Sequence, residues 1–214
     1  MPSAITNVAG YRFVDLVDLD RLQSVFRSVC VDLGLKGTVL LAPEGLNFFV
    51  AGPVSSIDGF VEFLERDERF AGIDLKRSLT DYQPFNRLNI RKKKEIISVG
   101  LDHIRPADAT GARISPQAFK AMLDNGEFVH GLDTRNDYEM RIGTFENAIN
   151  LDLPTFRDFP EAVANLPHSM KDEPVVMFCT GGIRCEKASA IMMEAGFTNV
   201  KPVSYTHLTL PTTT

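Results

Sequence analysis

The sequence of 214 residues contains few cysteines and no tryptophan. Its three cysteines are too few for a disulfide framework, and Cys179 and Cys185 lie only six positions apart. No uncharged apolar run approaches the roughly 18–20 residues that cross a bilayer, so we expect no membrane span. The N-terminus lacks a basic start followed by an apolar stretch, which indicates no secretory signal. We therefore expect a cytoplasmic protein.

The sequence also lacks a pattern for a metal or an organic cofactor. Its four histidines do not cluster with cysteines or carboxylates at ligand spacing, so we predict no metal site. No flavin fingerprint and no iron-binding triad occur, and no cofactor is visible in the residues. The histidines are His103, His130, His168 and His207.

Positive charge is concentrated in one stretch of an acidic chain. The formal net charge is −5, yet Lys76 to Lys94 contains seven basic residues and one acid, Asp81. A local patch of this kind suggests a site for a polyanion. A solvated basic strand or loop would give the same composition, so composition alone leaves both interpretations open.

The first hundred residues alternate between strand and helix patterns. The order β-α-β-β-α-β predicts a ferredoxin-like domain. In chain order, the expected elements are a strand over Tyr11–Leu16, a helix from Asp20 to Gly34, a hairpin of Gly37–Ala42 and Leu46–Ala51, a helix from Ser55 or Ser56 to near Gly72, and a strand over Asp74–Ser78.

The rest of the chain predicts a different class, an α/β domain with a parallel sheet. Strands with continuous apolar residues alternate with helices, which is typical of parallel sheets covered on both faces. We expect a ferredoxin-like domain over 1–100, a linker over 101–113 and a parallel-sheet domain over 114–201. The expected elements are a helix after Ser115-Pro116, strands over Phe128–Leu132, Ala148–Leu151 and Val175–Cys179, and a helix over Cys185–Ala195.

One cysteine follows the most apolar of these strands. Cys179 ends the run Val175–Cys179 and is followed by Gly181, Gly182 and Arg184. The carboxyl edge of a parallel sheet is where open α/β folds bind ligands. The glycine-rich backbone, the start of a helix and the arginine all favour an anionic sulfur. The pattern therefore predicts a nucleophilic thiolate in an anion-binding loop.

The length of this loop separates two kinds of chemistry. Four residues lie between Cys179 and Arg184. Cysteine phosphatases need five, because their ring must hold a phosphate. The smaller ring suits a single sulfur atom carried as a persulfide, as in rhodaneses. A phosphatase is thus disfavoured.

Several segments carry a resemblance to a known family. The loop after the apolar strand resembles a rhodanese active site, and the Asp133-Thr134-Arg135 segment with Glu139 resembles the rhodanese Asp-x-Arg-x-x-x-Glu signature. Gly143–Asn150 resembles a further rhodanese segment, with Thr144 and Asn147 in place of the usual His and Gly. Together the segments resemble the bacterial rhodanese-domain tRNA uridine hydroxylases. The segments that carry this resemblance are Leu41–Gly52, Asn89–Gly100, Asp133–Tyr138, Phe156–Pro160 and Cys179–Ser189.

The resemblance implies an architecture, a function and a set of site residues. The architecture is a ferredoxin-like, acylphosphatase-like first domain followed by a rhodanese domain. It implies oxygen-dependent hydroxylation of the wobble uridine of certain tRNAs to 5-hydroxyuridine, with molecular oxygen as co-substrate. Cys179 would be the active-site cysteine, in a loop formed by Thr180, Gly181, Gly182, Ile183, Arg184 and Cys185. Asp133 and Arg135 would support that loop.

With tRNA as the implied partner, the basic stretch is expected to contact phosphates. Phe85 nearby could stack on a base or could belong to the core. Cys185 could resolve a sulfenic acid or disulfide at Cys179, or could simply pack in the first helical turn. The predicted phosphate-binding residues are Arg87, Arg91, Lys92, Lys93 and Lys94.

The last residues differ in composition from the rest. The segment from Val203 to Thr214 has no charged side chain at neutral pH and is rich in threonine. We expect a non-native tail over 202–214 and a parallel-sheet domain that is incomplete at its C-terminus.

Two other functions stay open at this point. The loop alone favours a persulfide-carrying sulfurtransferase that acts in tRNA thiolation or sulfur relay. A non-catalytic binding module is the third interpretation. The sequence gives no indication of the oligomeric state.

Overall fold

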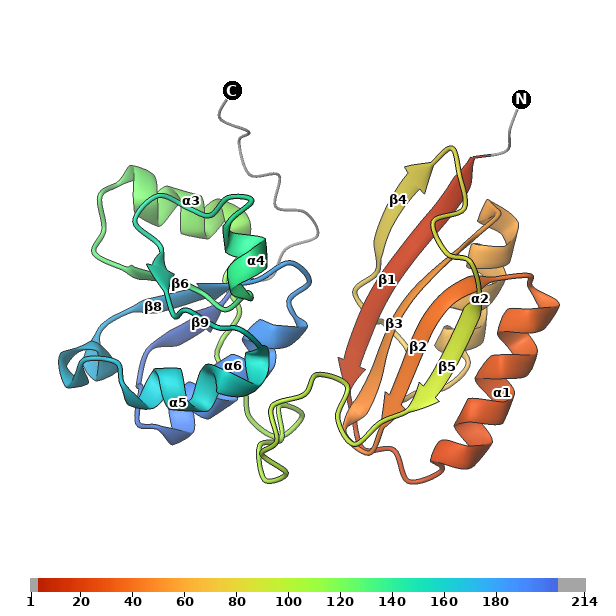
Figure 1. Cartoon of the computed structure of the whole chain (residues 1–214), viewed down its shortest axis with the longest axis horizontal. Helices are drawn as coiled ribbons and strands as arrows, with labels where there is room; N and C mark the ends of the chain where they lie inside the picture. The colour runs from red at the N-terminus through yellow and green to blue at the C-terminus, as the bar shows by residue number, and fades with distance from the viewer. Residues whose placement is uncertain (1–3, 204–214) are drawn as a thin grey trace. The chain divides into compact units, whose positions relative to one another are not determined.

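A computed structural model describes residues 4–203 of the chain. The chain divides into two compact units, the first ending at Ile96 and the second beginning at Ile97 (Figure 1). Their folds differ, as the sequence predicted. The predicted tail falls outside the described residues except for Pro202 and Val203.

The first unit is a five-stranded sheet with two helices on one face. The sheet has the order β4-β1-β3-β2-β5, in which β5 runs parallel to β2 and the other neighbours are antiparallel. This confirms the ferredoxin-like, acylphosphatase-like class. The elements are β1 (Ile5–Phe13), α1 (Leu19–Asp32), β2 (Lys36–Ala42), β3 (Gly45–Gly52), α2 (Val54–Glu65), β4 (Lys76–Thr80) and β5 (Leu88–Lys92).

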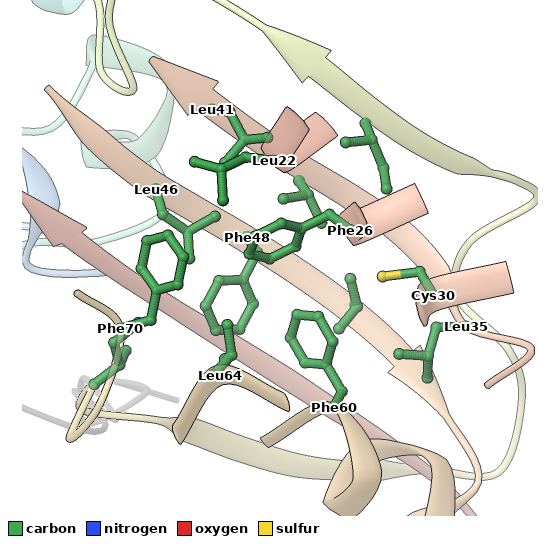
Figure 2. Close-up of a cluster of buried hydrophobic side chains, with 14 of the residues drawn as sticks. Leu22, Phe26, Cys30, Leu35, Leu41, Leu46, Phe48, Phe60, Leu64 and Phe70 are labelled. Atoms are coloured by element: carbon green, nitrogen blue, oxygen red, sulfur yellow. The ribbon is translucent and has the colours of Figure 1, made fainter. Parts of the chain in front are cut away.

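Apolar side chains between the helices and the sheet form the core of this unit. Figure 2 shows Phe26 and Cys30 of α1 and Phe60 of α2 facing Phe48 of β3. The rings of Phe48 and Phe60 meet edge to face, with centroids 5.3 Å apart. Alternate residues of the strands point into this core, which is why a two-residue period was visible in the sequence.

Three features of this unit differ from the expected elements. The helix α2 ends at Glu65 rather than near Gly72, and two strands also differ. The first strand covers Ile5–Phe13 rather than Tyr11–Leu16, because its pairing with β3 runs from Thr6 to Phe13. The strand β5 was not expected: Ile90 is its one buried residue, so its sequence shows no apolar run.

The second unit is a parallel four-stranded sheet in the order β7-β6-β8-β9. This confirms the expected parallel α/β class. The elements are α3 (Pro116–Asp124), β6 (His130–Asp133), α4 (Asp137–Met140), β7 (Ile149–Asn150), η1 (Phe156–Asp158), α5 (Phe159–Ala164), η2 (His168–Asp172), β8 (Val175–Phe178), α6 (Ile183–Glu194) and β9 (Val200–Pro202).

The central strand β8 is buried on both faces. Val175 and Met177 pack into the cluster that contains residues of α5 and α6, whereas Val176 and Phe178 pack against Phe119 of α3. A strand covered on both faces has apolar residues at every position rather than at every second one, which explains the continuous apolar run that begins at Val175.

The segment before α3 packs on the second unit. Ile104 is buried in the same cluster as α6, and the backbone N–H of Gly111 donates to Ser189 Oγ at 3.0 Å. At the other end of the unit, Val203 is buried and forms a parallel bridge with Ile114. The predicted limits of the linker and of the native sequence stay predictions.

Candidate active site

Cys179 follows directly after β8, at the carboxyl edge of the parallel sheet and before α6. Its side chain is buried, and the residue is 1% exposed. Gly182 caps α6 with a φ of 87°, a left-handed conformation that favours glycine. In this conformation its backbone N–H donates to Cys179 Sγ at 3.0 Å. The left-handed conformation of Gly182 thus lets the loop direct this N–H group toward the sulfur.

The surroundings of Cys179 favour a thiolate. Burial raises its pKa, but hydrogen bonds from the Cys185 thiol and from loop N–H groups, together with the charge of Arg184, outweigh burial. The net effect lowers the pKa of Cys179 from 9.0 to about 5. The thiol is therefore ionised at neutral pH, as the loop pattern predicted.

Glu139 holds the two ends of the loop. Its carboxylate accepts a hydrogen bond from Thr180 Oγ1 at 2.6 Å and one from the Arg184 guanidinium at 2.8 Å. Burial raises the pKa of Glu139, but these donors and the charge of Arg184 lower it to about 2. Glu139 also caps its own helix through the Asn136 N–H. The charge pair fixes Arg184 beside the sulfur.

Asp133 and Arg135 form a second ion pair, one strand further along the sheet. Asp133 is fully buried, and Arg135 Nε donates to it at 2.9 Å. The Arg135 guanidinium also reaches the Gly143 carbonyl at 2.7 Å, and the Thr144 hydroxyl donates to Asp133 at 2.8 Å. These hydrogen bonds tie β6 to the segment before β7, not to the cysteine loop. Whether the pair also supports the loop stays a prediction.

Two buried polar residues near the site were not predicted: Thr134 contacts Cys185 of the loop, and Lys187 lies two residues further along α6. The Thr134 hydroxyl donates to the Phe178 carbonyl at 3.1 Å and lies 3.5 Å from Cys185 Sγ. Lys187 of α6 is fully buried and donates to the Ile97 carbonyl at 3.0 Å. Thr134 lies between Asp133 and Arg135 of the rhodanese signature, but its position in the sequence does not indicate a contact with Cys185.

The predicted phosphate-binding residues lie together on the first unit. Arg91 and Lys92 are on β5, while Lys93 and Lys94 follow it directly; these four and Arg87 are exposed. Lys92 forms an ion pair with Asp20 of α1.

Phe85 packs edge to face against Phe49, with ring centroids 5.0 Å apart. Phe49 is 47% exposed, so this aromatic pair lies at the surface of the sheet rather than in the core.

The described part of the chain holds neither a metal cluster nor a membrane span. Across residues 4–203, no three histidine, cysteine or acidic side chains gather in a way that could hold a metal ion. Over the same residues, no helix combines the length and the apolar character that crossing a membrane requires.

Comparison with known proteins agrees with both folds. A model of the UPF0176 acylphosphatase-like domain matches residues 5–96, and a model of the rhodanese-like domain matches residues 115–204. Among solved structures, BlrB, a BLUF protein in its dark state, is a distant match: it covers 47% of this chain and 80% of its own, with a TM-score of 0.38 and 19% identity.

Curated relatives match across both units. A tRNA uridine(34) hydroxylase of Cupriavidus necator is 47% identical over 201 residues, covering 92% of this chain and 71% of that protein. One of Thiobacillus denitrificans is 42% identical over 202 residues, covering 92% of this chain and 82% of the relative. With this identity across two dissimilar domains in the same order, the chain belongs to the tRNA uridine(34) hydroxylase family.

Proposed function

We propose that this protein hydroxylates the wobble uridine of tRNA to 5-hydroxyuridine, with Cys179 as its active-site cysteine and molecular oxygen as co-substrate. The observation that carries the proposal is the Cys179 thiolate, held in its loop by the Gly182 N–H and by Arg184, in a chain of this family. Reaction with tRNA implies a cytoplasmic location.

In this proposal the residues around Cys179 keep its sulfur reactive. The loop N–H groups and Arg184 stabilise the negative charge, so no base has to remove a proton before the sulfur acts. Glu139 is a positioning residue, because it acts through Arg184 and Thr180 rather than on the sulfur. A preorganised anion site of this kind avoids reorganisation during the reaction.

The substrate would be held by the basic stretch of the first unit. Arg87, Arg91, Lys92, Lys93 and Lys94 can neutralise phosphates without reading sequence. Replacing Lys93 and Lys94 with glutamate should weaken tRNA binding. It should also flatten the dependence of log Kd on log salt, by about one unit of slope for each phosphate that the variant no longer neutralises.

The matched control for this measurement is Arg66→Glu. Arg66 is an exposed basic residue that directly follows α2, outside the basic stretch. It should leave both the affinity and the slope close to wild type. Equal losses in the control and in the double variant would contradict the assignment of the basic stretch.

A persulfide-carrying sulfurtransferase is the second candidate, favoured by the four-residue ring between Cys179 and Arg184. Mass spectrometry of tRNA from a deletion strain separates the two functions. Loss of 5-hydroxyuridine and its derivatives, restored by wild type but not by Cys179→Ser, supports hydroxylation; loss of thiolated uridine supports sulfur transfer.

Cys30→Ala is the matched control in this experiment, because Cys30 is a buried thiol of the other unit. Full modification with Cys179→Ser would instead favour a non-catalytic binding module and refute both enzymatic proposals.

A further inference from the structure

The cysteine loop contains a second thiol in contact with the first. Cys185, in the first turn of α6, is fully buried. Its S–H and its backbone N–H both donate hydrogen bonds to Cys179 Sγ. The Thr134 hydroxyl oxygen lies 3.5 Å from Cys185 Sγ, within hydrogen-bond distance for sulfur. The two sulfurs therefore face each other inside one site, held by β8, α6 and the end of β6.

The two thiols differ in protonation. The pKa of Cys185 is raised well above 9.0 by burial first, and then by the hydrogen bond to Cys179 and by the negative charge of that sulfur. Cys179 is ionised at neutral pH, as described above. The site thus pairs an ionised sulfur, which can attack an electrophile, with a neighbouring thiol that still carries its proton.

The cysteine loop reaches the protein surface, although its sulfur is buried. Cys179 itself is 1% exposed, but Thr180 is exposed and no atom lies within 4 Å of a Cβ built on Gly181. The loop therefore borders solvent on this side. Small shifts of the loop would let a molecule the size of water or hydrogen peroxide reach the sulfur.

We propose that Cys179 and Cys185 form a dithiol site that reacts with hydrogen peroxide and closes reversibly into a disulfide. The Cys179 thiolate attacks one peroxide oxygen, the O–O bond breaks, and Cys179 sulfenic acid and hydroxide form. Cys185 sulfur then attacks the sulfenic sulfur. The S–S bond forms as the S–OH bond breaks, and the hydroxyl leaves as water with the Cys185 proton.

The overall step is balanced in electrons. Two thiols lose two electrons to the peroxide, which is reduced to water. A small dithiol would return the pair to its starting state by thiol–disulfide exchange. The disulfide has a consequence for the site: it removes the thiolate and stops any reaction that depends on it. It also protects Cys179 from irreversible oxidation to the sulfinic acid.

The test treats the purified 214-residue chain with one to a few equivalents of hydrogen peroxide, followed by denaturing alkylation and mass spectrometry. We expect the wild type to lose about 2 Da and two of its three alkylatable thiols, with a peptide that links Cys179 to Cys185. A small dithiol should restore all three. Cumene hydroperoxide should react more slowly than hydrogen peroxide.

Variants isolate the role of each sulfur. Cys185→Ser should stop at the sulfenic acid of Cys179, trapped by dimedone, and then proceed to the sulfinic acid. Cys30→Ala, a buried thiol of the first unit, should behave as wild type. Cys179→Ser should leave Cys185 reduced, which keeps the proposal testable if Cys185→Ser fails to fold.

Two results would overturn the dithiol site. One is a wild type that accumulates dimedone adduct or sulfinic acid as readily as Cys185→Ser. The other is the absence of the linked peptide after complete peroxide consumption. The measurement needs no tRNA, so its failure leaves the proposed hydroxylation untouched, and failure of the hydroxylation assay leaves the disulfide result intact.

Discussion

Replacing Glu139 with glutamine should lower the stability of the second unit in a pH-dependent way. The pKa of this carboxyl is about 2 in the folded protein, against an ordinary value of 4.5. At about 1.4 kcal/mol per pH unit, this difference is worth about 3 kcal/mol at neutral pH. The side chain is 16% exposed and its partner Arg184 12%, so solvent screens the pair only partly.

The sign of the pH dependence follows from the direction of that pKa. A carboxyl whose folded-state pKa is lowered stabilises the fold fully above its unfolded pKa, and this contribution is lost as the pH falls toward the folded value. Between pH 7 and pH 3 the Glu139 contribution should fall by about 2 kcal/mol. The gap in unfolding free energy between wild type and Glu139→Gln should therefore be about 2 kcal/mol larger at pH 7 than at pH 3.

Urea unfolding at the two pH values, followed by pulse hydrogen exchange, measures this gap for each unit separately. Peptides of β8 and α6 report on the second unit, and peptides of β1 to β3 serve as an internal reference. Glu146→Gln, at an exposed glutamate of the same unit, is the matched control and should change little at either pH. An equal gap at pH 7 and pH 3 would refute the ion-pair argument, even if the variant is less stable.

Three other outcomes are expected. Alkylation of Cys179 by iodoacetamide should be nearly constant in rate from pH 7 to pH 9 and decline as the pH falls through about 5. Arg184→Gln should move that decline to higher pH, and an unchanged profile would contradict the assigned role of its charge. Gly182→Ala should cost roughly 1 kcal/mol or more, measured by urea unfolding, and lower tRNA hydroxylation, because its φ is 87° and its N–H binds the sulfur. Gly181→Ala should be tolerated, because open space lies beside Gly181. Equal losses of stability in Gly181→Ala and Gly182→Ala would refute the distinction between the two glycines. Gly37→Ala should destabilise the first unit, since the added Cβ would lie 2.2 Å from a backbone oxygen of β3; a melting temperature equal to wild type would contradict it.

The sequence predicts the parts of this molecule whose local pattern agrees with their environment. In the hairpin of β2 and β3 and in the buried strand β8, the spacing of apolar residues along the sequence matches the pattern of buried positions. Around the site, Gly182 and Arg184 follow the cysteine in a recognisable order. The strand β5 was not expected, because four of its five residues are not buried and its pairing partner lies about fifty residues earlier in the chain.

The polar contacts of the site were predicted least well. The hydrogen bonds of Glu139 to Thr180 and Arg184 join residues about forty positions apart, and no local pattern encodes such a contact. The departures from the rhodanese segment become clear only in three dimensions. Thr144 supplies a hydroxyl to Asp133, and Asn147 adopts a φ of 59°, a conformation that asparagine tolerates better than most residues and that glycine adopts readily.

The attachment of the segment before α3 determines where the second unit can be cut from the first. Lys187 and Ser189 of the helix that follows the cysteine bind Ile97 and Gly111, and a Cβ on Gly111 would lie 2.5 Å from the Val200 carbonyl oxygen. A rhodanese fragment that starts where the family match starts would remove these contacts from α6. A fragment that starts at Ile97 retains them. The segment of about fifteen residues between the two domains therefore belongs to the second unit, and any exchange of domains between relatives should include this segment with the rhodanese domain.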